Sequence, residues 1–80
     1  MERTEIFEKL NEIFEDVLDL EGGVNLSEET SANDIEEWDS LSHVQLVVAV
    51  EKAFKLKFTS SEIMKWQNVG QMVDTIESKL

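Results

Sequence analysis

Apolar residues in the first twenty positions recur at spacings of three and four, which is the period of an amphipathic helix. The pattern predicts a helix from about Arg3 to Leu20. Gly22 and Gly23 follow where a left-handed C-cap is usual, so we expect them to end this helix. The residues of the apolar stripe are Ile6, Leu10, Ile13, Phe14, Val17 and Leu18.

A second helix is predicted in the middle of the chain. Asp39 is a preferred N-cap residue, and the run from Ser40 to about Phe54 keeps the helical period until Lys55-Leu56-Lys57 breaks it. A brief extended segment over residues 56–58 is an alternative interpretation of that break.

The last quarter of the chain predicts two more helices. Thr59 and Glu62 have the spacing of a capping box, which indicates a short third helix, and Asn68 is suited to cap a fourth. We expect Met64, Trp66 and Met72 to fill the core. Other apolar residues of these two helices are Ile63, Val69, Val73, Ile76 and Leu80.

Between Glu21 and Asp39 the helical period disappears. A loop of this length in a compact domain is usually functional or packed down by its own side chains. Isolated apolar residues that could pack it are Val24, Leu26, Ile35 and Trp38. The predicted fold class is therefore all-α: a small bundle of three main helices plus one short helix, with a long loop after the first.

Eighty residues predict a single domain over 1–80. A chain this short buries only about 60% of its unfolded surface, which leaves little interior for a deep substrate pocket, and we expect no enzyme. The chain has no cysteine and one histidine, His43, which excludes thiolate catalysis and Cys/His zinc sites.

Charge is the most unbalanced part of the composition. Eighteen acidic residues against seven basic ones give a net charge of −11. The first forty residues hold 14 acids and two bases, and the last forty hold four acids and five bases. Phosphates would be repelled, so we expect no nucleic acid partner, and basic docking surfaces on partners instead. With no long apolar run and no export signal, we expect no membrane insertion and a cytoplasmic location.

An acidic calcium-binding protein is a rival class that fails on spacing. A twelve-residue EF-hand loop that starts at Asp19 would place Val24 where glycine is required and Thr30 where a bidentate glutamate is required.

The second helix has two apolar stripes. A broad stripe is the expected core face, and a narrow one beside Ser40 is an expected exposed patch for a partner. Burial of the helix nearly all round is the alternative. The broad stripe contains Leu46, Val47, Val50, Ala53 and Phe54, and the narrow one contains Leu41, Val44 and Val48.

Ser40 is the residue with chemical promise. At the first helical position it lies beside free backbone N–H groups and the positive end of the helix dipole, which favours a phosphate. Asp39 beside it could hold the divalent cation of an enzyme that transfers a phosphate group to the hydroxyl. Propensity alone would make both residues ordinary helix-start residues.

The wider pattern is more specific than the tripeptide Asp39-Ser40-Leu41. The tripeptide begins a predicted helix after a long acidic loop, and an apolar run from Val44 to Phe54 follows it. This arrangement closely resembles the acyl carrier proteins and related phosphopantetheine-binding carrier domains, over essentially the full chain in length, helix order and acidity.

The resemblance implies that Ser40 accepts 4′-phosphopantetheine from coenzyme A through a magnesium-dependent phosphopantetheinyl transferase. The arm would carry acyl or aminoacyl groups as thioesters between a loading enzyme and downstream synthases or transferases. The absence of cysteine agrees, since the sulfur arrives with the arm. The resemblance also implies that the outer face of the second helix docks on partner enzymes and that the core beneath can open to hold a carried chain; a monomer is expected. The docking residues would be Leu41, Val44, Gln45, Val48 and Glu51, with Lys52.

Several departures bear on the subtype. Fatty-acid-type carriers commonly have a glycine shortly before the motif and a run of acids along the second helix. Here Trp38 precedes the motif, and that helix contains Glu51 as its only acid, with Lys52 and Lys55 nearby. We therefore expect a specialised carrier that serves a dedicated pathway, whether fatty-acid-like, polyketide or another, rather than the housekeeping fatty-acid carrier. Acids on the loop side could offer a negative patch: Asp34, Glu36, Glu37 and Asp39.

Two alternatives stay open. The Val44-Gln45-Leu46 stretch also suits aminoacyl or peptidyl carriers, D-alanyl carriers included. An acidic helical adaptor without any modification is the other. We expect His43 at the surface or a pocket rim, and Trp38 to anchor the loop on the bundle. The acids of the first helix should repel one another, so salt or divalent cations should stabilise the protein.

Overall fold

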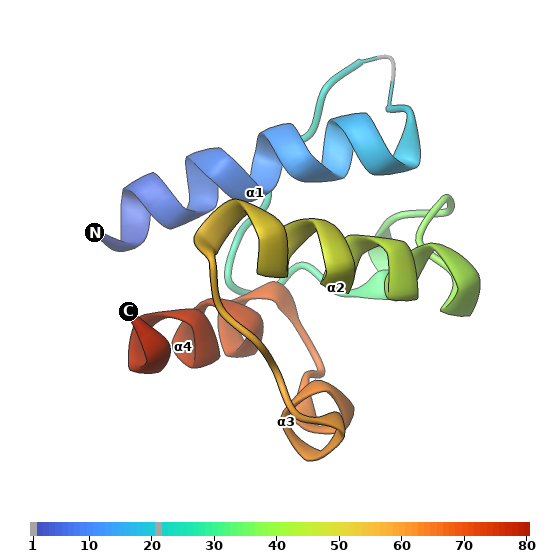
Figure 1. Cartoon of the computed structure of the whole chain (residues 1–80). Helices are drawn as coiled ribbons and strands as arrows, with labels where there is room; N and C mark the ends of the chain where they lie inside the picture. The colour runs from blue at the N-terminus through green and yellow to red at the C-terminus, as the bar shows by residue number, and fades with distance from the viewer. Residues whose placement is uncertain (1, 21) are drawn as a thin grey trace.

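The structure, a computed structural model, describes residues 2–20 and 22–80. The described residues form four α-helices: α1 (Arg3–Leu18), α2 (Ser40–Phe54), the short α3 (Ser60–Lys65) and α4 (Val69–Lys79) (Figure 1). The all-α prediction is confirmed. Residues 56–58 join α2 to α3 without forming a strand. The beginning of α1 and the end of α4 lie together, at the side of the molecule away from the beginning of α2.

Three helix starts lie where the cap residues predicted them. The carboxylate of Asp39 accepts a hydrogen bond from the backbone of Ser42 at 2.9 Å, and the Ser42 hydroxyl accepts one from the Asp39 backbone at 2.8 Å. Thr59 and Glu62 form the predicted capping box of α3. Asn68 accepts from the backbone N–H of Gln71 at 2.9 Å and caps α4. These bonds satisfy donors that a helix cannot satisfy within itself.

The predicted glycine cap of α1 is wrong. The helix ends at Leu18, and Asp19 takes the left-handed C-cap conformation with φ 53°. A short polar side chain lets aspartate enter this region more readily than most residues. Gly22 and Gly23 therefore lie in the loop, where Gly23 has φ 75°.

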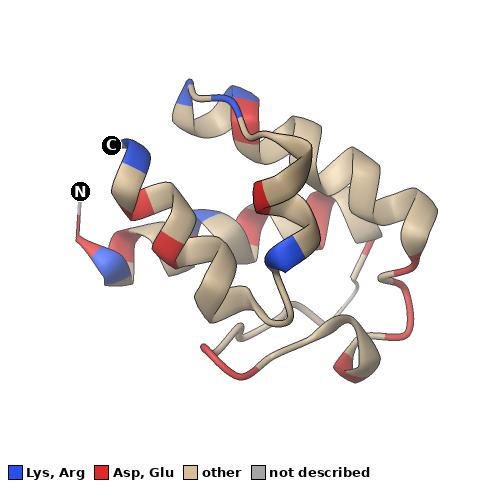
Figure 2. Cartoon of the chain, turned by 90° about the horizontal axis from the view of Figure 1, so that it is seen from below, with Lys and Arg blue, Asp and Glu red and all other residues tan. Residues whose placement is uncertain are grey.

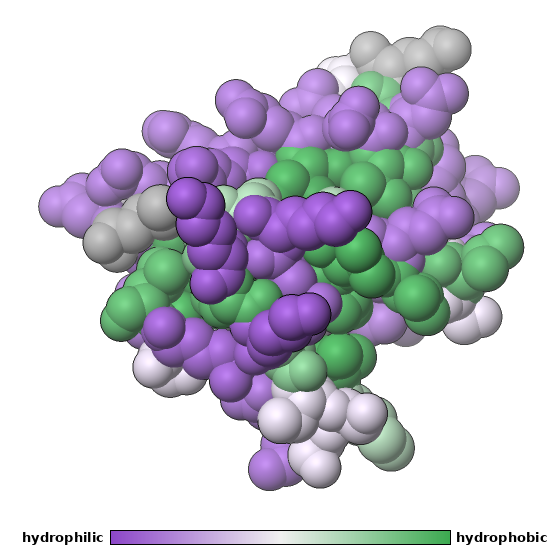
Figure 3. Space-filling model, in the orientation of Figure 1, coloured by the Kyte–Doolittle hydropathy of each residue, from purple (hydrophilic) through white to green (hydrophobic). Residues whose placement is uncertain are grey.

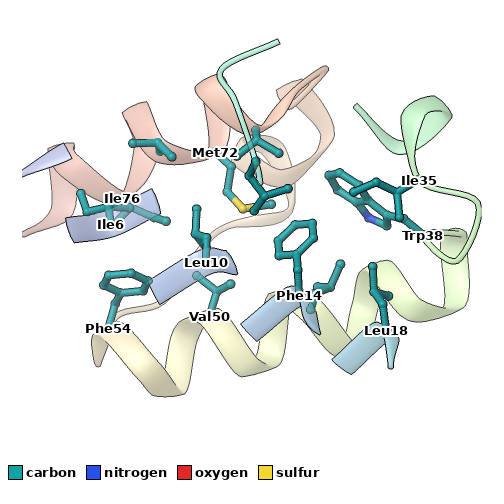
Figure 4. Close-up of a cluster of buried hydrophobic side chains, with 14 residues drawn as sticks. Ile6, Leu10, Phe14, Leu18, Ile35, Trp38, Val50, Phe54, Met72 and Ile76 are labelled. Atoms are coloured by element: carbon teal, nitrogen blue, oxygen red, sulfur yellow. The ribbon is translucent and has the colours of Figure 1, made fainter. Parts of the chain in front are cut away.

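The core is a continuous cluster of apolar side chains from α1, α2, α4 and the loop (Figure 4). Met72 fills it as predicted and Trp66 packs against its edge, whereas Met64 is 84% exposed, so its predicted core role is wrong. Ala53 is also exposed, at the edge of the broad stripe. The buried members are Ile6, Leu10, Phe14, Leu18, Leu26, Ile35, Trp38, Leu46, Val50, Phe54, Val69, Met72, Val73 and Ile76.

The long loop is packed down by its own apolar residues, as expected. Leu26, Ile35 and Trp38 are buried, and the Trp38 ring meets Phe14 edge-on at 4.9 Å between centroids. A short 3-10 helix, η1 (Ala32–Asp34), gives the loop a turn of regular structure that its composition did not predict.

The loop backbone also accepts hydrogen bonds from the first turn of α4. Thr30 accepts from the Val69 N–H at 2.8 Å, and Glu28 accepts from the Gly70 N–H at 3.0 Å. A Cβ at Gly70 would lie 2.8 Å from the Glu28 carbonyl oxygen, so only glycine fits this approach. The first turn of α4 is thereby capped by the loop.

Arg3 connects the same loop to two helices. Its guanidinium pairs with Glu28 at 2.5 Å, with Asp74 at 2.9 Å and with Glu77. The hydrogen bond to Glu28 is the largest cause that raises the pKa of Arg3 above its ordinary value. One of the two bases in the acidic half thus ties the loop and α4 to the start of α1.

Candidate functional site

Ser40 is the first residue of α2, and its side chain is exposed. Asp39 before it is fixed as the N-cap by the bonds to Ser42. The hydrogen bond from the Ser42 backbone is the largest cause that lowers the pKa of Asp39, so this carboxylate is ionised at neutral pH. The Ser42 hydroxyl donates to the Glu37 carbonyl at 2.9 Å, which fixes the approach of the loop to α2. An exposed hydroxyl therefore lies at the first residue of a well-capped helix.

The narrow stripe of α2 faces outward. Leu41 is 73% exposed, Val44 60% and Val48 43%, which rejects burial of the helix all round. Leu46, Val47, Val50 and Phe54 are buried on the other side. Figure 3, in the orientation of Figure 1, shows apolar surface on the face toward the viewer, interrupted by hydrophilic side chains. Exposed aliphatic side chains in a row beside a free hydroxyl suit contact with another protein.

Two further predicted docking residues flank this stripe. Gln45 is exposed, whereas Glu51 is half-buried. The Glu51 carboxylate accepts a hydrogen bond from the Phe58 backbone at 2.8 Å and so holds the connection between α2 and α3. The sequence pattern did not reveal this bond, because it joins a helix to a loop seven residues later.

His43 lies on the side of α2 that faces the loop, at the rim of a cavity of about 80 Å³. Its Nδ1 accepts a hydrogen bond from the Trp38 indole N–H at 3.0 Å, and the two rings stack at 5.9 Å between centroids. Burial lowers the pKa of His43, and the bond to Trp38 needs its neutral form. His43 thus serves to hold Trp38. Both residues were predicted near these places, whereas their pairing was not, because no local sequence pattern indicates a hydrogen bond between a loop residue and a helix residue five positions later.

A wider groove of about 410 Å³ lies at the other end of α2. In the sequence Lys55-Leu56-Lys57 indicated a break in the helix, and the groove was not predicted. The signal was a leucine between two lysines directly after an exposed apolar stripe. The lining residues are Val48, Glu51, Lys52, Lys55, Leu56 and Lys57.

Residues 2–20 and 22–80 contain no group of three or more His, Cys, Asp or Glu side chains that could hold a metal ion. No helix in this described part is long and apolar enough to cross a membrane. The start of α2 offers one exposed hydroxyl, one ionised carboxylate and a helix N-terminus.

Comparisons with known proteins agree on one family. The family described as "Phosphopantetheine attachment site" matches residues 8–76. The chain is 35% identical to an acyl carrier protein of Coprothermobacter proteolyticus over 80 residues, which is the whole chain and 96% of the relative. It is 34% identical to an acyl carrier protein of Guillardia theta, with 98% of that relative covered.

A solved structure is similar in both sequence and fold. It is the solution structure of a holo acyl carrier protein from Geobacter metallireducens, with a TM-score of 0.85 and 43% identity. The match covers 92% of this chain and 84% of the other.

Proposed function

Because this chain belongs to the phosphopantetheine-binding acyl carrier proteins, we propose that Ser40 is the residue that bears the 4′-phosphopantetheine arm and that residues 1–80 act as one carrier domain. The protein is a carrier and not an enzyme, and its cofactor is phosphopantetheine. The observation that carries the proposal is the exposed Ser40 hydroxyl at the first position of α2.

The residues around Ser40 fit a phosphate ester. The N-terminus of a helix favours a negative charge by about 0.3–1 kcal/mol. The Asp39 carboxylate is ionised and held beside the hydroxyl, where it can contact the divalent cation of a transferase. The packed loop keeps this helix start at the surface, since Trp38 is anchored in the core directly before it.

The arm, when attached, supplies a thiol that carries acyl groups as thioesters. Within the chain, which has no cysteine, Ser40 anchors the arm and the outer face of α2 presents it to other proteins. The names of the relatives favour acyl cargo over aminoacyl or peptidyl cargo, D-alanyl included.

A phosphopantetheinyl transferase and the enzymes of a biosynthetic pathway are the partners of an acyl carrier protein. We place their docking on the outer face of α2, with Leu41, Val44, Gln45 and Val48 at its centre and Glu51 at its edge. The departures of this chain from fatty-acid-type carriers, which are Trp38 before the motif and Glu51 as the only acid of α2, favour a dedicated specialised pathway over housekeeping fatty-acid synthesis. We further propose a cytoplasmic monomer that binds no nucleic acid, in keeping with its charge of −11.

Intact-protein mass spectrometry after incubation with coenzyme A, magnesium and a broad-specificity phosphopantetheinyl transferase tests the assignment of Ser40. We expect one arm on the unmodified sequence and none on Ser40→Ala. Ser61→Ala is a matched control, because Ser61 is also exposed in the first turn of a helix and should leave the modification intact. An arm on Ser40→Ala, or an unchanged mass of the original chain with several transferases, would contradict the proposal.

A further inference from the structure

We infer that the groove at the C-terminal end of α2 binds the far end of the carried chain, and that the cargo it fits is an acyl group that ends in a carboxylate. The inference rests on the proposed attachment at Ser40.

The groove combines apolar walls with a basic rim. Val48 and Leu56 line it with aliphatic surface, and both keep part of their side chains exposed. Lys52, Lys55 and Lys57 line the same groove and are exposed. A methylene chain suits the walls, and an anion suits the ammonium groups.

These lysines are not neutralised by acids in the described part of the chain. Among residues 2–20 and 22–80, the ion pairs are those of Arg3 and the pair between Lys79 and Glu62 at 3.1 Å. Glu51 is the acid that lines the groove, and its carboxylate accepts from the Phe58 backbone. The groove therefore has three lysines and one carboxylate, which is already hydrogen-bonded to the backbone, in a chain of net charge −11.

Ser40 and the groove lie on the same side of α2. At 100° per residue, the positions of Ser40, Val44, Val48 and Lys55 fall within a strip about 80° wide. At 1.5 Å per residue, Val48 lies about 12 Å from Ser40 along the helix and Lys55 about 22 Å. A phosphopantetheine chain has about 14 bonds, which at the extension of a polypeptide backbone span about 17 Å. An acyl group at its end thus reaches the groove along the exposed apolar stripe.

The charge distribution favours an anionic end at this place. Figure 2 shows acidic residues near the beginning of α2 and basic residues around its other end. Glu36, Glu37 and Asp39 are exposed close to Ser40 and repel a carboxylate from that end. A cargo that ends in a methyl group would gain the apolar walls alone.

The experiment compares two cargoes of equal length on the ¹⁵N-labelled full chain. A promiscuous transferase loads Ser40 from adipoyl-coenzyme A, whose chain ends in a carboxylate, or from hexanoyl-coenzyme A, whose chain ends in a methyl group. We expect the adipoyl form to shift the amide signals of Val48, Lys52, Lys55 and Lys57 relative to the hexanoyl form, and to lose these shifts at high salt. We also expect a lower pKa for the adipoyl carboxylate than on free adipoyl-pantetheine.

The triple variant Lys52→Gln, Lys55→Gln, Lys57→Gln should abolish both effects, and Lys65→Gln is the matched control, since Lys65 is exposed on α3. Equal spectra for the two cargoes, or shifts that survive the triple variant, would overturn the inference and leave the groove to an acidic partner protein. Intact mass distinguishes the two levels of failure: no loading refutes the role of Ser40 and this inference with it, whereas loading without the shifts refutes this inference alone.

Discussion

The two sides of α2 are built from the same kinds of aliphatic residue, but one side is buried and the other is exposed. Leu46 and Val50 are almost wholly buried in the core, whereas Leu41 and Val44 are mostly exposed. Burial of an aliphatic side chain contributes about 1.5–3 kcal/mol, so the inner side stabilises the fold. The exposed side chains of the outer side do not contribute this stabilisation. The difference teaches that hydrophobicity in this helix does not report stability, and that the outer residues are available for contacts with other molecules.

The largest expected effect separates the two sides by stability. Leu46→Ala should lower the free energy of unfolding by about 2–5 kcal/mol, because it leaves a cavity in the core. Val44→Ala should change it by less than about 0.5 kcal/mol, since the side chain is exposed and alanine favours the helix. Urea unfolding followed by circular dichroism measures both. Similar losses in the two variants would break the comparison.

The next effect separates them by function. Val44→Asp should reduce kcat/KM for modification by the transferase about tenfold, which corresponds to about 1.4 kcal/mol of lost transition-state binding. Its urea midpoint should stay near that of the original chain. Thr4→Asp, at an exposed position of α1, is the control and should leave kcat/KM unchanged. Full activity in Val44→Asp would remove this residue from the docking face.

A smaller effect concerns His43, at the boundary between α2 and the loop. Burial holds its folded-state pKa below the ordinary value of about 6.5, so the unfolded chain binds the proton more readily. The stability that this depression gives is present above pH 6.5 and falls as the pH drops from there toward the folded pKa. His43→Gln should flatten that part of the curve of unfolding free energy against pH. An unchanged slope in the variant would assign the pH dependence to other groups.

The smallest effect concerns charge and reflects the acidic first half of the chain. Salt should raise the melting temperature, because it screens repulsion among 14 acids that face two bases. Divalent cations should act in the same direction at lower concentration. The triple lysine variant, which makes the chain still more acidic, should show a larger increase with salt. A melting temperature that is independent of both salt and divalent cations would contradict this interpretation.

Much of the fold could be predicted because it is encoded locally. The spacing of three and four predicted α1, α2 and α4, and Asp39, Thr59 and Asn68 marked helix starts through bonds to residues three positions away. Met64 was misplaced because α3 has only six residues, too few for a period to distinguish its buried side from its exposed side.

What the sequence did not reveal depends on distant contacts. Arg3 meets Glu77 across the whole chain, and Gly70 must be glycine because of a loop carbonyl forty-two positions before it. The start of the site was predictable, since a cap, a serine and an exposed stripe follow one another in sequence. The groove had only the Lys55-Leu56-Lys57 pattern as a signal, and its shape depends on how the chain turns after Lys55.

The placement of the two ends of the fold has a consequence for engineering. The start of α1 and the end of α4 lie on the side away from the start of α2, in a molecule whose longest dimension is 30 Å. A fluorescent protein, a surface anchor or a neighbouring catalytic module fused at either end would be attached on the side opposite Ser40. Ser40 would then face away from the fused partner. The distance over which the serine could reach other proteins would be set by the length of the linker and not by steric blocking from the partner.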